Sequence, residues 1–174
     1  METQVIELGA AAIEAHVDTL SRILVDSVDK GASISFMAPM SDKDAASFWL
    51  NDVLPEVAAG RRVMFGAERG DTMVGTVQLL IAMPPNQQHR CEVAKMIVHP
   101  SARRLGVGRS LMARAIEHAS ELGKTLITLD TRTGDAAEPL YTSAGFQVAG
   151  VIPDFAWDPD GQARHATTYM YRRI

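Results

Sequence analysis

The chain has 174 residues, 47% of them hydrophobic and 22% charged, and a formal net charge of −4. This size favours a single domain over residues 1–174, and the acidic balance argues against general binding of nucleic acids. The single cysteine, Cys91, excludes an intrachain disulfide, and no apolar run reaches the roughly 18 residues of a membrane span. The first residues lack the pattern of a secretory signal, so we expect a cytoplasmic protein.

The first half of the chain combines helical and strand patterns. Apolar residues recur at helical spacing over 13–28, and Gly31 follows them as a stop signal. Ser41 and Asp44 form a capping pattern at the start of a second helix. The predicted elements are a strand at 4–8, a helix at 13–28, a loop or irregular strand at 31–40, a helix at 41–60 and strands at 62–68, 73–83 and 91–98.

The second half predicts two more helices and three more strands. Gly123 and Gly145 each follow a helical pattern, as glycines at helix ends commonly do. The predicted elements are a helix through 111–122, a strand at 125–131, a helix at 136–144 and strands at 146–152 and 167–172. A right-handed crossover makes the strands at 91–98 and 125–131 parallel. We therefore predict an α/β protein with a mixed central sheet of about seven strands flanked by about four helices.

The stretch HPSARRLGVGRSLM, residues 99–112, places Gly106 and Gly108 between a strand and a helix. The first turn of a helix has unpaired N–H groups and a partial positive charge, and a glycine lets an anion approach the backbone closely. Leu111 stands where a dinucleotide fingerprint needs its third glycine, and Gly123-Lys124-Thr125 lacks the upstream glycine of a P-loop. The stretch indicates either an anion site or a turn that only redirects the chain.

The run Arg103-Arg104-Leu105-Gly106-Val107-Gly108 resembles the R/Q-x-x-G-x-G/A signature of the GNAT N-acetyltransferases. The preceding Met96-Ile97-Val98-His99-Pro100 and the downstream Ala137-x-x-x-Tyr141-x-x-x-Gly145-Phe146 resemble the same family, in the same order, across residues 92–146. Gly134 departs from the pattern, since the family often has asparagine there, and a side-chain contact from that position is lost. The resemblance implies a GNAT-like domain that uses acetyl-CoA.

The same resemblance implies where acetyl-CoA binds. Backbone N–H groups from Arg104 to Arg109 are expected to hold its pyrophosphate, and the backbone at Ile97 and Val98 is expected to pair with its pantetheine arm. The Val98 N–H is also our candidate donor to the carbonyl oxygen as that oxygen becomes negative. The residues expected to bind acetyl-CoA are Ile97, Val98, Arg103, Arg104, Leu105, Gly106, Val107, Gly108, Arg109, Ser110 and Tyr141.

Acetyl transfer requires a neutral amine. At pH 7, deprotonation costs roughly 4.6 kcal/mol for a lysine-like amine of pKa about 10.4, and about 1.4 kcal/mol for an α-amino group of pKa about 8. Asp130 ends a strand parallel to the one that carries Glu92, at the edge where α/β proteins bind ligands. Both acids are candidate bases, acting directly or through water. The plainer alternatives are a turn acid at Asp130 and a solvated acid at Glu92.

Tyr141 is the candidate acid. A tyrosine on a short helix ordinarily packs in the core with its hydroxyl at the rim. Its place in the family motif implies instead that it protonates the departing CoA thiolate. Cys91 is interpreted as a small buried apolar residue, and the five histidines show no metal-ligand spacing, so no metal is expected.

Stretches outside the cofactor motif narrow the expected acceptor. GASISFM at 31–37 and DPDG at 158–161 are similar to the tabtoxin-resistance acetyltransferases, which act on a small β-lactam amino acid. We therefore predict an N-acetyltransferase that acts on the primary amine of a small, amino-acid-like molecule, by direct attack in a ternary complex. The alternatives are a protein N-terminal or lysine acetyltransferase and a non-catalytic acyl-CoA sensor. No nucleic-acid or membrane partner is expected, and a homodimer is open.

Overall fold

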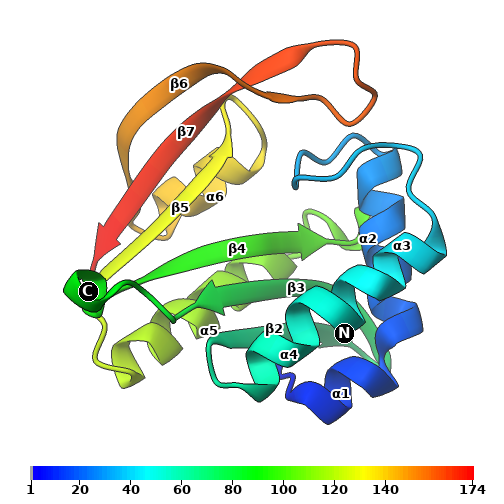
Figure 1. Cartoon of the computed structure of the whole chain (residues 1–174), viewed down its shortest axis with the longest axis horizontal. Coiled ribbons are helices and arrows are strands. Elements are labelled where there is room, and N and C mark those ends of the chain that lie inside the picture. Colours follow the sequence, from blue (N-terminus) through cyan, green and yellow to red (C-terminus); the bar gives the residue numbers. More distant parts are fainter. Residues whose placement is uncertain (1) are drawn as a thin grey trace.

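The computed structural model describes residues 2–174, which form one seven-stranded mixed sheet (Figure 1). The strands are β1 (Thr3–Glu7), β2 (Arg62–Arg69), β3 (Thr72–Leu80), β4 (Arg90–Val98), β5 (Leu126–Arg132), β6 (Gln147–Trp157) and β7 (Arg164–Arg173). Their order across the sheet is β1-β2-β3-β4-β5-β7-β6. Neighbours run antiparallel, except that β4 and β5 are parallel as predicted. Within residues 2–174, none of the helices has the length and hydrophobicity to cross a bilayer.

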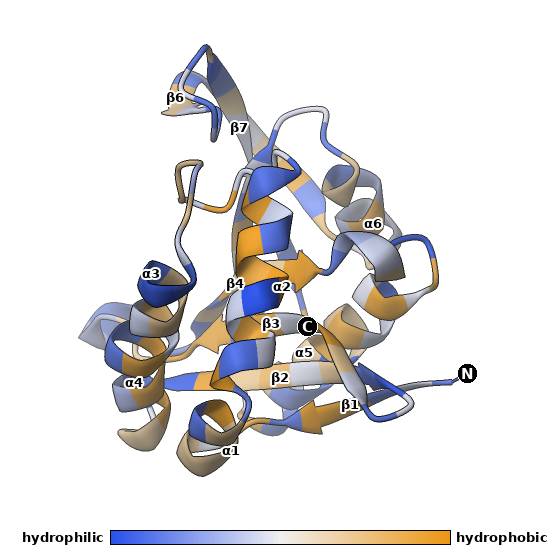
Figure 2. Ribbon diagram, turned by 90° about the vertical axis from the view of Figure 1, so that its right-hand side faces the viewer, coloured by the Kyte–Doolittle hydropathy of each residue, from blue (hydrophilic) through white to orange (hydrophobic). Residues whose placement is uncertain are grey.

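Helices cover both faces of the sheet. α5 (Val107–Glu121) and α6 (Ala137–Ser143) lie on one face, and α1 (Ala10–Ala15), α2 (Val17–Asp29), α3 (Asp42–Ser47) and α4 (Leu54–Ala58) lie on the other. Buried residues of α2, such as Leu20, Leu24 and Val28, recur at helical spacing, so one side of that helix packs inward (Figure 2). Each face of the sheet therefore has its own apolar core.

Side chains of the central strands alternate between the two faces. In β3, Val77 and Leu79 belong to the core beneath α5. Gln78 and Leu80 consequently point to the opposite face, where both residues line a cavity. The alternation of β3 thus directs Gln78, a polar residue within an apolar run, toward the cavity.

The predicted order of elements is confirmed, with differences in their extent. The helix predicted at 13–28 is broken at His16, and the one at 41–60 contains a π-helical turn, Phe48–Val53, which includes the buried Trp49. The predicted cap is present, since Ser41 Oγ accepts from the Asp44 N–H at 3.0 Å. The last two strands are longer than predicted because β6 is exposed along nearly its whole length, which leaves no alternating pattern in its sequence.

A bulge interrupts β4. Two of its residues, Lys95 and Met96, lie opposite the single Val77 of β3, and Lys95 takes a φ of 49°, in the left-handed region. The extra residue reverses the alternation of the strand. Val93 therefore faces the core beneath α5, whereas Ile97, four residues later, packs with the core on the α2 side.

β4 and β5 separate before the bulge is reached. They pair only from Arg90 to Glu92 on β4 and from Leu126 to Thr128 on β5. Residues from both strands then line a single cavity of about 1240 Å³, together with the start of α5, the loop at 31–40 and the ends of β6 and β7. The separation of two parallel strands thus opens this cavity between the two parts of the sheet.

Candidate active site

The glycine turn forms a cradle of backbone donors at the start of α5. Gly106 caps the helix with a φ of 84°, which favours glycine, and its carbonyl accepts from the Ser110 N–H at 3.1 Å. That bond is the first of the helix, so the N–H groups of Val107, Gly108 and Arg109 precede any intrahelical partner. All three residues line the cavity. The helix end therefore offers an anion both donors and a favourable dipole.

The two glycines serve different purposes. A Cβ on Gly106 would meet nothing within 4 Å, so its absence leaves the turn open to a ligand. A Cβ on Gly108 would lie 3.0 Å from Leu140 Cδ2 of α6. At Gly108 the missing Cβ also allows α5 and α6 to approach each other, and the approach of an anion to both glycines stays a prediction from the sequence.

Gly108→Val is accordingly expected to destabilise the fold. The added side chain would overpack the contact between α5 and α6, at a cost of about 1–3 kcal/mol in the free energy of unfolding. Denaturant unfolding of the variant measures this loss. Gly150→Val is the matched control, because a Cβ there meets nothing within 4 Å. The double variant Gly108→Val with Leu140→Ala should recover part of the stability; wild-type stability in the single variant would contradict this packing role.

Most of the residues predicted to bind acetyl-CoA line the cavity. Those that do are Ile97, Val98, Arg103, Arg104, Gly106, Val107, Gly108, Arg109 and Tyr141. Leu105 and Ser110 are not among the lining residues. The Leu105 side chain is exposed and its carbonyl accepts from Arg69, while Ser110 Oγ donates to the Gly106 carbonyl at 3.4 Å. Leu105 and Ser110 therefore belong to the turn but do not face the cavity.

The backbone of β4 presents Val98 to the opening. The His99 N–H donates to the Val74 carbonyl of β3 at 2.8 Å. Because N–H groups alternate in direction along a strand, the N–H of Val98 points away from β3, toward the opening beside β5. The same alternation directs the backbone of Ile97 toward its partner Thr76. The Val98 N–H is thus open to an extended ligand, whereas the Val98 carbonyl accepts from Arg103 Nε at 3.2 Å and the backbone of Ile97 faces β3.

The two candidate bases lie on the same face of the sheet. Glu92 pairs with Thr128, which precedes Asp130 by two residues, so all three side chains point the same way. Asp130 Oδ2 accepts from Thr167 Oγ1 at 3.0 Å, and Glu92 Oε2 lies 3.7 Å from Arg90 Nη1. Both acids line the cavity. The structure therefore brings together two carboxylates that the sequence separates by 38 positions.

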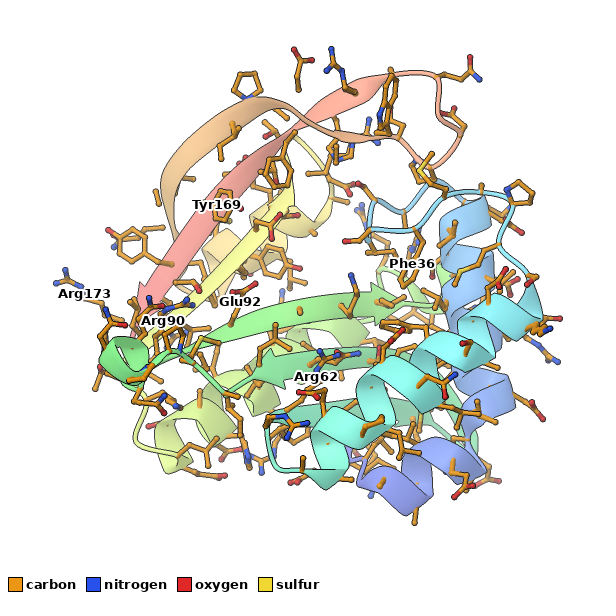
Figure 3. All side chains as sticks on the ribbon, viewed as in Figure 1. Phe36, Arg62, Arg90, Glu92, Tyr169 and Arg173 are labelled. Carbon is orange, nitrogen blue, oxygen red and sulfur yellow. The ribbon has the colours of Figure 1, made fainter. Side chains whose placement is uncertain are left out.

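Tyr169 stands beside these acids and has no signal in the sequence. It is the cross-strand partner of Asp130, and Figure 3 shows its ring above Glu92. Burial raises its pKa, and the charges of Asp130 and Glu92 raise it further. Tyr169 therefore lies within the electrostatic influence of both acids.

Tyr141 lies in the wall of the same cavity. It is 6% exposed, and its ring packs against Phe146 with the centroids 6.2 Å apart. Its hydroxyl has no hydrogen-bond partner within residues 2–174. Burial raises the pKa of Tyr141 well above its ordinary value, and the charges of Asp135 and Asp130 add to the effect. The hydroxyl is therefore a neutral donor that no protein group has engaged.

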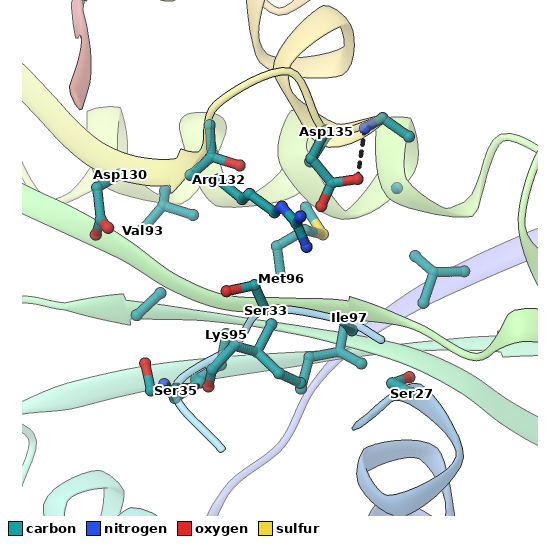
Figure 4. Close-up of a pocket in the computed structure, with 18 of the residues that line it drawn as sticks. Ser27, Ser33, Ser35, Val93, Lys95, Met96, Ile97, Asp130, Arg132 and Asp135 are labelled. Atoms are coloured by element: carbon teal, nitrogen blue, oxygen red, sulfur yellow. Dashed lines mark hydrogen bonds between the residues drawn. The ribbon is translucent and has the colours of Figure 1, made fainter. Parts of the chain in front are cut away.

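Lys95 is a cavity residue that the sequence analysis missed. Its Nζ donates to the Ile34 carbonyl at 2.9 Å and lies 5.2 Å from the centre of the Phe36 ring. Burial lowers the pKa of Lys95, while the charge of Asp130 acts in the opposite direction. Figure 4 shows Lys95 across the cavity from Asp130. Its position depends on the bulge in β4, which no pattern in the sequence reveals. Arg62 and Gln78 were also missed.

The loop at 31–40 closes one side of the cavity. Ser33 Oγ lies 2.8 Å from His165 Nε2, and His165 Nδ1 lies 3.0 Å from Asp158 Oδ1. The same Asp158 oxygen lies 2.8 Å from Arg132 Nη1. This chain of contacts connects the loop to the hairpin of β6 and β7 and to the end of β5.

Two other expectations concern the chemistry. Cys91 is fully buried, and burial raises the pKa of its thiol to about 11, so it packs as the sequence indicated and is not a nucleophile. Within residues 2–174, no group of three or more His, Cys, Asp or Glu side chains is placed to hold a metal ion.

Comparison with known proteins identifies the family. The model of the acetyltransferase (GNAT) family matches residues 31–146, which include the glycine turn, both candidate bases and Tyr141. The chain belongs to the acetyltransferase (GNAT) family. This GNAT protein resembles N-acetyltransferase 8B of Rattus norvegicus, with 31% identity over 94 residues, or 52% of the chain and 42% of that relative. The chain spans less than half the length of the curated relatives that it matches.

Solved structures show the same fold. An N-acetyltransferase from Staphylococcus aureus Mu50 superposes with a TM-score of 0.81 and 15% identity, over 99% of both chains. The yncA acetyltransferase from Salmonella typhimurium, solved with its cofactor acetyl-CoA, gives a TM-score of 0.78 and 18% identity, over 98% of this chain and 93% of that one. These similarities establish the GNAT architecture of the chain.

Proposed function

We propose that this protein is an acetyl-CoA-dependent N-acetyltransferase that acts on the primary amine of a small, amino-acid-like molecule. The observation that carries the proposal is the single cavity of about 1240 Å³, which connects the α5 donors to Glu92, Asp130 and Tyr141. Pockets for one small ligand usually measure about 300–1,000 Å³. A larger and continuous cavity suits two substrates that react with each other.

The residues present fit acetyl-CoA. The N–H groups of Val107, Gly108 and Arg109 would hold its pyrophosphate at the helix end, with Arg103 and Arg104 adding positive charge. The backbone of Val98 would pair with the pantetheine arm in the gap that β5 leaves. Acetyl-CoA supplies the activated acetyl group when it binds. The Val98 N–H would then donate to the carbonyl oxygen as negative charge develops there.

Glu92 and Asp130 would prepare the amine. Their negative charge draws an ammonium group to this end of the cavity, and either carboxylate could accept its proton directly or through one water. The neutral amine would attack the thioester carbon directly in the ternary complex. Tyr141 would donate from its hydroxyl to the departing sulfur, a role that suits a hydroxyl free of protein partners.

The loop at 31–40 bounds the acceptor side of the cavity, which favours a small substrate. The loop at 31–40 meets the turn at 158–161, where the Ala38 N–H donates to the Pro159 carbonyl at 2.8 Å. Phe36, Leu80 and Trp157 line this part of the cavity. Together with the similarity of residues 31–37 and 158–161 to the tabtoxin-resistance acetyltransferases, this enclosure supports an amino-acid-like acceptor. A cytoplasmic location stays a prediction from the sequence.

The proposal predicts a preference among acceptors. Free amino acids should be acetylated at least about 10-fold more efficiently, in kcat/KM, than their methyl esters or than peptides with the same terminal residue, a difference of roughly 1.4 kcal/mol. Release of free CoA thiol and mass spectrometry of the products measure this preference. Equal or faster reaction of the peptides would favour a protein acetyltransferase. Binding of acetyl-CoA with no acetylated amine in the panel would favour a sensor.

A further inference from the structure

Arg62 and Gln78 face the same side of the sheet as the candidate bases. In the register of the sheet, Arg62 of β2 lies opposite Leu80 of β3, and Leu80 lies opposite Glu92 of β4. Residues in register point to the same face, so Arg62 and Glu92 flank Leu80 with about 9–10 Å between their strands. Gln78 precedes Leu80 by two residues and shares this face. A guanidinium and a carboxylate thus stand at opposite sides of one apolar residue.

The donors of this pair are incompletely satisfied. Arg62 Nη1 donates to Gln78 Oε1 at 2.8 Å, but Arg62 Nε and Gln78 Nε2 are buried and have no hydrogen-bond partner in the described part of the chain. Gln78 is fully buried. Buried donors are nearly always paired in folded proteins, so two neighbouring unpaired donors in a cavity wall indicate a missing acceptor.

No carboxylate in residues 2–174 supplies that acceptor. Arg62 forms no ion pair in residues 2–174, and the nearby Glu56 is bound to Arg61 instead, at 2.6 Å. Asp52 also lines the cavity but acts on Arg62 only at a distance. Burial lowers the pKa of the Arg62 guanidinium, as expected for a cation without a close counterion.

Lys95 is another cation that lines the cavity, and it already has a hydrogen-bond partner. Lys95 Nζ donates to the Ile34 carbonyl, which fixes it against the loop at 31–40. Arg62 and Gln78 are therefore the donors left for a ligand. Figure 3 shows Arg62 beside β3 and Glu92 toward β5, on either side of β4. One end of the acceptor space is positive and the other is negative.

We propose that Arg62 and Gln78 form a subsite that binds the carboxylate of the acceptor, while Glu92 and Asp130 receive its ammonium group. The planar guanidinium can hold a carboxylate through two parallel N–H donors, and Gln78 Nε2 adds a third. This assignment rests on the proposed function and specifies it: the acceptor is a zwitterion, and Arg62 is the residue that selects it. The Ser33 hydroxyl of the loop at 31–40 is not assigned to this purpose, since it is bound to His165.

The test measures binding separately from reaction. Free amino acids and their carboxamides are titrated into the complex with CoA, which cannot transfer acetyl, and the affinities are compared by calorimetry. The wild type should bind at least one amino acid 10-fold or more tightly than its amide. Arg62→Met should abolish that preference and leave the affinity for CoA unchanged. Arg61→Met is the matched control, because Arg61 pairs with the exposed Glu56 outside the cavity.

A second variant keeps the guanidinium in place. Gln78→Glu would give Arg62 an internal carboxylate, so the preference for amino acids over amides should be lost although Arg62 is present. An equal affinity for amino acids and amides in the wild type, or a preference that survives both variants, would overturn the subsite. Preferential binding without acetylation when acetyl-CoA replaces CoA would leave the subsite standing and refute the proposed transfer.

Discussion

Replacing both Glu92 and Asp130 by their amides is expected to lower kcat/KM for the amine by about 10²- to 10⁴-fold, the usual contribution of a general base. The amides preserve the size of both side chains and remove the negative charge that attracts and deprotonates the ammonium group. Each single variant should lose less than the double variant, because the two carboxylates lie on the same face of the sheet and can act in place of each other. Steady-state kinetics of the three variants measure these losses.

The pH dependence separates a base from a merely attractive charge. If deprotonation is the lost step, the rate of the double variant should rise about tenfold per pH unit until the pH reaches the pKa of the amine, because solvent then supplies the neutral form. Glu117→Gln on the exposed side of α5 is the control and should match the wild type. A loss of the same size at every pH would assign the acids to binding only.

Tyr141→Phe is expected to lower kcat by about 10- to 1000-fold, as for a lost general acid. The change keeps the ring that packs on Phe146 and removes only the hydroxyl. The KM for acetyl-CoA should change little, because the hydroxyl acts as the sulfur departs. Stopped assays of CoA release measure both constants. Tyr171→Phe, which removes a hydroxyl bonded to Gln147 on the outer strands, should leave kcat unchanged.

The pH dependence of the wild-type kcat on the alkaline side tests the environment of Tyr141. Burial and the charges of Asp135 and Asp130 raise its pKa, so the hydroxyl keeps its proton above its ordinary pKa of about 10. The wild-type kcat should therefore show no decline due to Tyr141 up to that pH. A decline near pH 8 that Tyr141→Phe removes would disprove this account.

The sequence predicts the fold well where side chains alternate between water and a core. The apolar spacing of α2, the continuous apolar runs of β2 and β3 and the partial alternation in β4 and β5 indicated the elements and their order, since burial enforces each of these patterns. The π-helical turn around Trp49 and the full length of β6 were not predictable in this way. The first depends on the fit of one large side chain in the core, and the second on a strand with hardly any buried residue.

The candidate site was predictable where the backbone forms it and less so where side chains meet. Gly106 and the start of α5 follow from local chain geometry. The meeting of Glu92 with Asp130 required the parallel pairing of β4 and β5, which the crossover rule supplies. Lys95 could not be found, because one extra residue in β4 decides which face it reaches. Arg62 became significant only once the register placed it opposite Leu80 and Glu92.

The short pairing of β4 with β5 has a consequence for the mechanics of the molecule. The two parts of the sheet share main-chain pairing at only three positions, yet one apolar core spans them, with Phe65 and Leu79 from one part and Leu129 and Met170 from the other. Most of the contact between the two parts is therefore side-chain packing. Unlike a ladder of hydrogen bonds, this packing has no fixed register. The volume of those distant core residues therefore sets the angle between the two parts, and with it the width of the opening that we propose for acetyl-CoA.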